Sequence, residues 1–206
     1  APEIKWAALF EQLQIGEQTE FVVRQNDAIQ ASMKIFVETP VEVWADYLTI
    51  HALSTNASVL PTDIDQANFN FYGKEISGTP KQRERWKRGV AAVNGAMGEA
   101  VGQVYVERYF PPESKAQMEE LVENLKTAFA LRLDNLDWMG EETKEEAREK
   151  LASFTTKIGY PDKWTDYSSL EVVAGDAFGN SVRANRFAYE DMISNLGQPI
   201  DPTEWF

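Results

Sequence analysis

The sequence predicts a mainly α-helical fold, a multi-helix lobe with at most one or two short strands. Most of the chain consists of segments in which apolar residues recur three and four positions apart, the spacing of a helix with one buried face. Proline or glycine stands at the ends of most of these segments, and only one short run is typical of a strand. The 206 residues are 43% hydrophobic and 12% aromatic, a composition typical of a folded domain with a core.

The strongest helical signal covers residues 81–110. Its apolar positions follow one another at steps of three or four: Val90, Val93, Met97, Val101 and Val104. Thr79 and Pro80 predict the N-cap and the first helical position. Pro111 and Pro112 predict its end. We therefore expect this helix to be the centre of the domain, with the other helices packed around it.

Four glycines lie inside this expected helix: Gly89, Gly95, Gly98 and Gly102. An interior glycine destabilises a helix by about 0.5–1 kcal/mol relative to alanine, so four of them need a structural reason. The reason we expect is close packing, in which another helix approaches Gly95 or Gly98 at a point where a side chain would collide.

Shorter helices are expected over residues 2–13, 26–38, 40–51, 63–72, 113–136, 143–158 and 181–196. Residues 19–24, TEFVVR, favour a strand or a lone extended segment because β-branched and aromatic side chains dominate them. Gly159 and Pro161 predict the end of the helix over 143–158. Residues 161–179 have no helical period apart from one turn expected at 168–172. We therefore expect a division into a helical part, 1–160, and a connector with a final helix, 161–206.

The charge and composition exclude several classes of function. A net charge of −13 argues against binding to nucleic acid or to an anionic membrane, since both require a cationic surface. The one basic cluster, Lys81 to Arg88, is interpreted as the solvated first turns of the central helix. No apolar run approaches the ~20 residues of a membrane span. The absence of cysteine excludes disulfides and thiolate metal sites from this chain.

Catalytic residues cannot be assigned from the sequence. His51 is the one histidine, and its place beside Trp44, Tyr47 and Leu48 predicts a partly buried side chain without a catalytic role. One histidine without cysteine cannot form a histidine-based zinc site, and no GxSxG nucleophile motif is present. The carboxylates of residues 141–149 alternate with Lys144, Arg148 and Lys150, which favours ion pairs on a solvated helix face. We therefore assign no catalytic and no metal-binding residue, and leave substrate-binding residues unknown.

The two ends of the sequence suggest a piece of a longer polypeptide. The chain opens on APEIKW without an initiator methionine, and it closes on two aromatic residues, Trp205 and Phe206. Terminal aromatics exposed to water are unusual, so we expect residues 161–206 to depend on a partner segment for their order.

Three stretches resemble the neprilysin family of zinc metallopeptidases, which includes the endothelin-converting enzymes. They are Arg85 to Phe110 with its VNGAMGEAVGQVYVE run, LDNLDWM at 133–139 followed by Glu142, Thr143 and Ala147, and KIGYPD at 157–162. The final DPTEWF is similar to the segment just before the family's Asn-Ala-aromatic substrate-binding strand. That strand, the His-Glu-x-x-His zinc helix and the downstream glutamate ligand lie beyond Phe206 in the family pattern. The resemblance therefore transfers no catalytic residue to this chain.

The resemblance implies a zinc metalloendopeptidase of which this chain is the N-terminal, non-catalytic part. Residues 1–160 would form the helical lobe that caps the substrate cleft in a two-lobed enzyme, and 161–206 would lead back to the catalytic lobe. Zinc would be the cofactor of the complete enzyme, the catalytic C-terminal part its partner, and peptides its substrates. The cysteine-free sequence is similar to the bacterial members, which implies a periplasmic or extracellular location. The alternative is a non-catalytic helical module that binds peptides or proteins.

Overall fold

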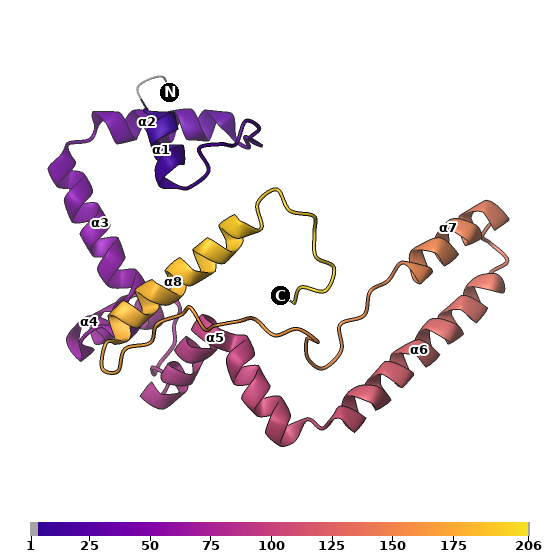
Figure 1. Cartoon of the computed structure of the whole chain (residues 1–206). Coiled ribbons are helices and arrows are strands. Elements are labelled where there is room, and N and C mark those ends of the chain that lie inside the picture. The colour runs from indigo at the N-terminus through magenta and orange to yellow at the C-terminus, as the bar shows by residue number, and fades with distance from the viewer. Residues whose placement is uncertain (1–3, 206) are drawn as a thin grey trace. The chain divides into compact units, whose positions relative to one another are not determined.

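A computed structural model describes residues 4–205 of the chain, and eight α-helices contain most of them (Figure 1). The described residues contain no β-strand, so the predicted mainly α-helical class is confirmed. A short 3₁₀ turn, η1 (Ala57–Val59), precedes α4, and a π-helical segment, η2 (Phe69–Ile76), follows it. The helices are α1 (Trp6–Gln12), α2 (Asn26–Glu38), α3 (Val41–Thr55), α4 (Thr62–Asn68), α5 (Arg85–Tyr109), α6 (Pro112–Asp134), α7 (Glu141–Ala152) and α8 (Ala177–Ser194).

The chain folds as two units. The first consists of Ala1–Gly89 and Leu170–Gly197 and contains α1 to α4 and α8. The second consists of Val90–Ser169 and Gln198–Phe206 and contains α6 and α7. The boundary between the units falls inside α5. The division at residue 160 stays a prediction.

Most predicted helices are present, with ends that differ by a few residues. The long helix α5 begins at Arg85, so Thr79 and Pro80 lie in the loop before it and do not cap it. Residues 19–24 pair with no strand within the described chain, and a turn at 168–169 replaces the helical turn expected at 168–172. Residues 2 and 3 of the first predicted helix, and Phe206, lie outside the described residues.

A buried ion pair joins α4 to the start of α5 in the first unit. Asp65 of α4 is only 6% exposed, and its carboxylate lies 2.8 Å from a guanidinium nitrogen of Arg88. The side-chain amide of Gln82 donates a second hydrogen bond to the same carboxylate at 2.9 Å. Both carboxylate oxygens therefore have a partner, which a buried charge requires. Nearby, Asn68 donates to the backbone carbonyl and hydroxyl of Ser54, which ties α4 to α3.

In the second unit, aromatic rings hold residues 157–166 against the C-terminal half of α5. The rings of Phe110 and Tyr160 meet edge to face, and those of Tyr160 and Trp164 stack, with centroids 5.9 Å apart in both pairs. Trp164 lies over Gly102, where an added Cβ would sit 3.4 Å from the indole. Glycine at position 102 therefore allows the tryptophan to approach the helix closely.

Gly159 does not end α7 as predicted, because that helix already ends at Ala152 and leaves Phe154 and Ile158 in extended chain. Its positive φ of +73° instead turns the chain beside α6. An added Cβ would lie 2.9 Å from the ring of Phe110, so the position requires glycine for both backbone and space. Lys115 of α6 fixes the turn by donating to the Tyr160 carbonyl at 3.1 Å and to the Asp162 carboxylate at 2.7 Å.

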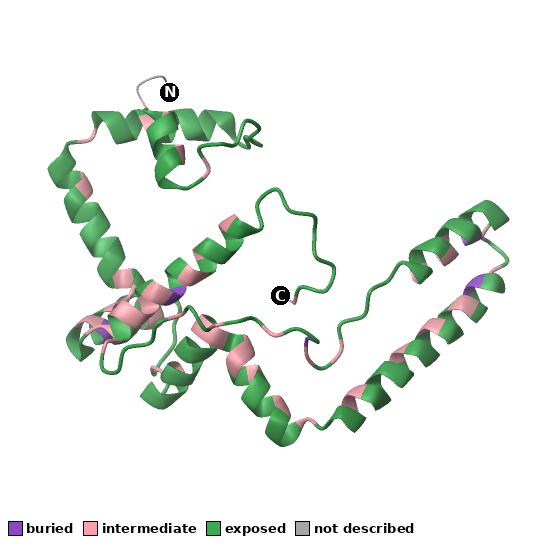
Figure 2. Cartoon of the chain, viewed as in Figure 1, coloured by how far each residue is buried: buried purple, intermediate pink, exposed green. Residues whose placement is uncertain are grey.

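Helix α5 is not the buried centre of the domain that the sequence predicts. None of its residues is buried by the rest of the described chain, and its ribbon is coloured as exposed or intermediate (Figure 2). A Cβ added at Gly95 or Gly98 would meet no atom within 4 Å, so the predicted close packing at these two glycines is wrong for this chain. The aromatic residue that does approach α5 closely does so one turn later, at Gly102.

The connector before α8 is extended, as predicted. The last residues of this connector are hydrogen-bonded to α8. The side-chain amide of Asn180 exchanges two hydrogen bonds of 2.8 Å with the backbone of Val173. Asp176 caps α8 by accepting the Gly179 N–H, and it pairs with Arg183. The Gly179 N–H first, and Arg183 second, lower the pKa of Asp176. The cap is therefore complete at neutral pH and weakens only as the pH falls through this lowered pKa.

Replacing Asp65 tests the ion pair that joins α4 to α5. Asp65→Ala leaves Arg88, whose side chain is only 20% exposed, without its carboxylate. We expect the free energy of unfolding to fall by about 3 kcal/mol in a urea titration. The control is Glu190→Ala, which removes the carboxylate from an exposed arginine pair with Arg186 in α8 and should change nothing measurable. Equal urea midpoints for the two variants would contradict the structural role of Asp65.

Candidate interaction surface

The described residues contain no metal-binding constellation. Residues 4–205 hold no group of three or more His, Cys, Asp or Glu side chains placed to bind a metal ion. His51 lies on α3 with its ring centroid 4.2 Å from that of Tyr47. It is exposed and not partly buried as predicted, because no residue of α3 is buried by the described chain.

The basic cluster at residues 81–88 is only partly the solvated helix start that the sequence predicts. Lys81, Arg83 and Arg85 are exposed, but the first two precede the helix. Arg88 turns inward to the buried Asp65. One of the five cations of this cluster is therefore a structural residue.

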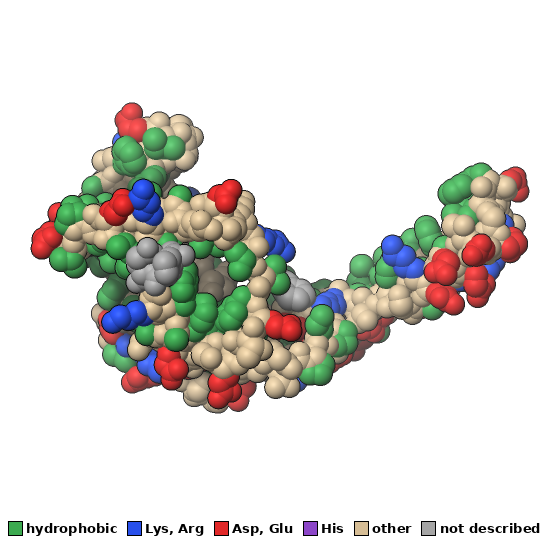
Figure 3. Space-filling view, turned by 90° about the horizontal axis from the view of Figure 1, so that it is seen from above, with side chains coloured by type: hydrophobic (Ala, Val, Ile, Leu, Met, Phe, Trp, Pro, Cys, Tyr) green, Lys and Arg blue, Asp and Glu red, His purple; other side chains and the backbone are tan. Residues whose placement is uncertain are grey.

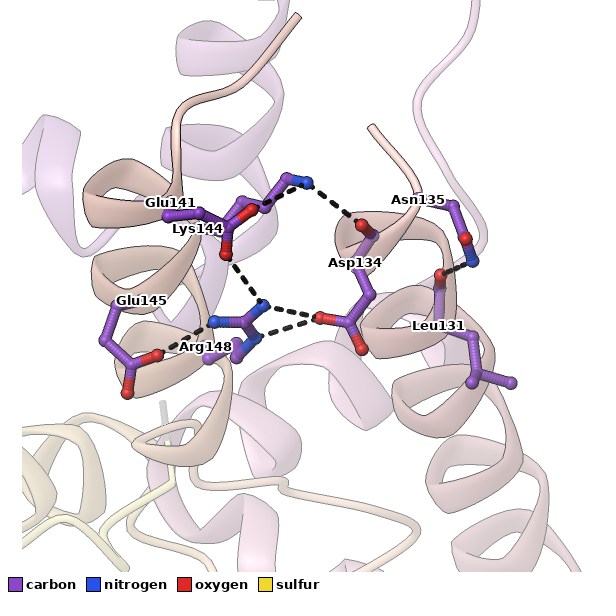
Figure 4. A network of polar contacts seen from close by, with 7 residues as sticks. All are labelled: Leu131, Asp134, Asn135, Glu141, Lys144, Glu145 and Arg148. Atoms are coloured by element: carbon purple, nitrogen blue, oxygen red, sulfur yellow. Dashed lines mark hydrogen bonds and ion pairs between the residues drawn. The ribbon is translucent and has the colours of Figure 1, made fainter. Parts of the chain in front are cut away.

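The charged residues of α7 form ion pairs, as the sequence predicts, and they also reach α6 (Figure 4). Lys144 is buried, donates to the Asp134 carbonyl at 3.0 Å and pairs with Glu141 at 3.3 Å. Arg148 binds the Asp134 carboxylate and, one turn back along its own helix, Glu145 at 2.8 Å. The hydrogen bonds to Asp134 first, and to Glu145 second, raise the pKa of Arg148.

This network satisfies the C-terminal end of α6. The last carbonyl groups of a helix have no partner within the helix itself. Lys144 supplies a donor for one of them, the Asp134 carbonyl, while Asn135 donates to the Leu131 carbonyl at 2.6 Å. Positive charge is also favourable at this end of a helix dipole. The polar contacts thereby fix α7 beside α6 as a helical hairpin.

The apolar residues of α6 divide into two lines, and α7 covers only one of them. Leu133 is 3% exposed, and Val122 and Ala130 on the same side are half-buried. The second line, which we call the α6 stripe, is exposed to water and consists of Met118, Leu121, Leu125 and Phe129. In the sequence both lines belong to one run of apolar residues three and four positions apart. The sequence signal that could have distinguished the two lines is the width of the apolar arc around the helix, which is wide enough to contact two neighbouring elements.

Exposed apolar side chains are found along the whole described chain. Green hydrophobic side chains reach the surface in the space-filling view, also on the α6–α7 hairpin beside its red acidic residues (Figure 3). The accessible surface is 16526 Å² for a mass of 23.3 kDa. Two separate compact units sharing this mass equally would expose only about 11,700 Å². Surfaces of this kind, and patches such as the α6 stripe, mark interaction sites.

The family model described as Peptidase family M13 matches residues 1–161. That is more than three quarters of the chain, and it includes every helix from α1 to α7.

The chain belongs to peptidase family M13. Human neprilysin is 33% identical to it over 144 residues, which are 66% of this chain and 19% of neprilysin. The resemblance to the neprilysin family is therefore confirmed, and the match lies in the N-terminal part of the family's proteins.

Two solved structures of the zinc metalloprotease 1 of Mycobacterium tuberculosis are similar to this M13 chain. The first, described as an open state, is 36% identical, has a TM-score of 0.88, and is matched over 98% of this chain and 32% of that chain. The second, described as a partial open state, is 38% identical with a TM-score of 0.78 over 92% of this chain and 30% of that chain. This chain thus spans between a fifth and a third of the length of the proteins it matches.

No helix in residues 4–205 combines the length and the apolar character that a bilayer span requires.

The 206-residue chain by itself is predicted to bind no zinc tightly and to hydrolyse no peptide. A catalytic zinc site needs three protein ligands, and the sequence offers one histidine and no cysteine. Elemental analysis after dialysis, together with a peptidase assay, measures both properties. Stoichiometric zinc accompanied by chelator-sensitive peptidase activity would overturn the prediction.

Proposed function

We propose that this chain is the N-terminal part of a neprilysin-like zinc metalloendopeptidase. In this proposal residues 1–160 form the helical lobe that encloses the zinc cleft, and residues 161–206 lead back to the catalytic lobe. The observation that carries the proposal is the match of nearly the whole chain to a zinc metalloprotease, at 36% identity and a TM-score of 0.88.

The donor groups of this chain do not fit a catalytic zinc ion. The described residues bring no three suitable side chains together, and the single histidine is exposed on α3 beside a tyrosine. The zinc of the complete enzyme therefore belongs, in our proposal, to ligands in the catalytic part. This chain would contribute shape, by limiting which peptides enter the cleft.

The exposed apolar faces support a large interface with the catalytic part. The α6 stripe contains four large side chains, and burying each such side chain contributes about 1.5–3 kcal/mol. Residues of the connector and tail, such as Val172 and Ile200, are exposed as well. A partner that covers these faces would supply the burial that the chain itself lacks.

The remaining parts of the proposal follow from the family. The substrates would be peptides, the partner would be the catalytic C-terminal part, and the location would be periplasmic or extracellular. The net charge of −13 continues to argue against nucleic acid as a ligand. The alternative is a helical binding module without catalysis. The exposed apolar faces would suit its protein partner as well as they suit a catalytic part, so they do not favour this alternative over the enzyme.

Two leucines of α6 provide a matched test in the complete enzyme. Leu125 lies in the α6 stripe and is 60% exposed, and Leu131 is 61% exposed but lies about 240° further around the helix axis. If the catalytic part covers the stripe, Leu125→Ser should lower the free energy of unfolding by about 2 kcal/mol or more. Leu131→Ser, the control, should leave it unchanged.

Thermal or urea unfolding of both variants, together with chelator-sensitive peptidase activity, measures the outcome. Equal effects of the two serines would contradict the proposed interface at the stripe. A complete wild-type polypeptide without chelator-sensitive peptidase activity would contradict the proposed enzyme function itself.

A further inference from the structure

Helix α5 is interrupted at a single residue. The backbone of Met97 has φ −151° and ψ 51°, far from the helical values of its neighbours, and the helix bends there (Figure 1). Kinks in helices have identifiable causes, of which proline and glycine are the commonest. The helix contains no proline, but Gly95 and Gly98 lie on either side of Met97.

Each end of α5 is held firmly by its own unit. At the N-terminal end, Arg88 pairs with the buried Asp65 at 2.8 Å. In the C-terminal half, the Glu99 carboxylate accepts the Thr165 N–H at 2.6 Å, and Trp164 packs on Gly102. These contacts lie two and five residues after Met97.

The glycines and valines between these two anchors have little packing in the described chain. An added Cβ at Gly89, Gly95 or Gly98 would meet no atom within 4 Å. Val90 and Val93 in the same stretch are about half exposed. The segment therefore combines permissive glycine backbone with little packing, and both properties lower the cost of changing its backbone angles.

We propose that Gly95 to Gly98 form a hinge about which the two halves of α5 reorient. The inference rests on the proposed function, because it assigns to this hinge the opening and closing of the peptide cleft in the complete enzyme. Hinges are a few residues that absorb a change in φ and ψ between rigid elements, and mutating them often changes kcat and KM together. The tied ends of α5 are the rigid elements, and the glycines around Met97 absorb the change.

Alanine at the two glycines tests the hinge without creating a collision. Neither glycine has a positive φ and both have open space, so Gly95→Ala with Gly98→Ala is compatible with the structure. Alanine favours helical backbone, so the double variant should straighten α5. Gly89→Ala is the matched control, since it has the same open space in the same helix but lies eight residues before Met97.

The distance across the bend is measured in the complete enzyme with spin labels at Lys87→Cys and Glu107→Cys. Both positions are exposed, and this chain has no cysteine that would compete for the label. In a straight helix these positions lie about 30 Å apart along the axis. We expect a shorter, broad distribution in the wild type and with Gly89→Ala, and a narrow one near the straight-helix value in the double variant.

The hinge also predicts a several-fold loss of kcat in the double variant at unchanged zinc content, with Gly89→Ala like wild type. Distances and kcat that do not differ between the double variant and Gly89→Ala would overturn the hinge. A lower thermal midpoint of the double variant would also overturn it, because it would mean that another segment packs closely on these glycines. If the double variant does not fold, each single alanine is measured in the same way.

These outcomes separate the hinge from the proposed function. A complete enzyme that hydrolyses peptides with unaltered distances in the double variant contradicts the hinge alone. A complete polypeptide that hydrolyses no peptide contradicts the proposed function and, with it, the role assigned to the hinge.

Discussion

Burial of apolar surface is the constraint on which the rest of this structure depends. Folding is driven mainly by removing apolar side chains from water, yet the described residues bury few of theirs: Ala57, Leu133 and Ala184 are the buried hydrophobic residues. The accessible surface of 16526 Å² exceeds what two compact units of this mass would expose. In our proposal the stability of these helices therefore comes largely from surfaces outside them, supplied by the catalytic part.

Specific polar contacts give the helices their local order where an apolar core is missing. Asp65 and Arg88 join α4 to α5, and Lys144 and Arg148 join α7 to α6. Such contacts are directional, so they fix how two neighbouring elements meet. They also leave the outer faces of the helices free, and the α6 stripe remains available for a partner. The middle of α5 lies between the pair of Arg88 with Asp65 and the hydrogen bond that Glu99 accepts from the Thr165 N–H, which is why it can act as a hinge.

The sequence predicts the helices well because apolar spacing and proline or glycine at helix ends are local signals. It predicts much less of the packing. The glycines at 95 and 98 indicate a special position in α5, but a glycine suits both close packing and a bend, and sequence alone cannot separate the two. The α6 stripe is equally ambiguous, because an apolar residue such as Leu125 has the same pattern whether its neighbour lies in this chain or elsewhere. His51 illustrates the same limit, since its predicted burial assumed a neighbouring element over this side chain, and the described residues leave it exposed. The assignment of no catalytic residue has a different basis, namely the count of one histidine and no cysteine, and it stays a prediction.

Hydrogen exchange of the 206-residue chain and of the complete enzyme tests the central claim most directly. The claim is that the exposed apolar faces of this chain are covered by the catalytic part of the same enzyme. The account predicts that amides along residues 118–129 and 198–205 become strongly protected in the complete enzyme and exchange quickly in the chain alone. Equal protection of these segments in both would show that the chain needs no such partner, and would contradict the account.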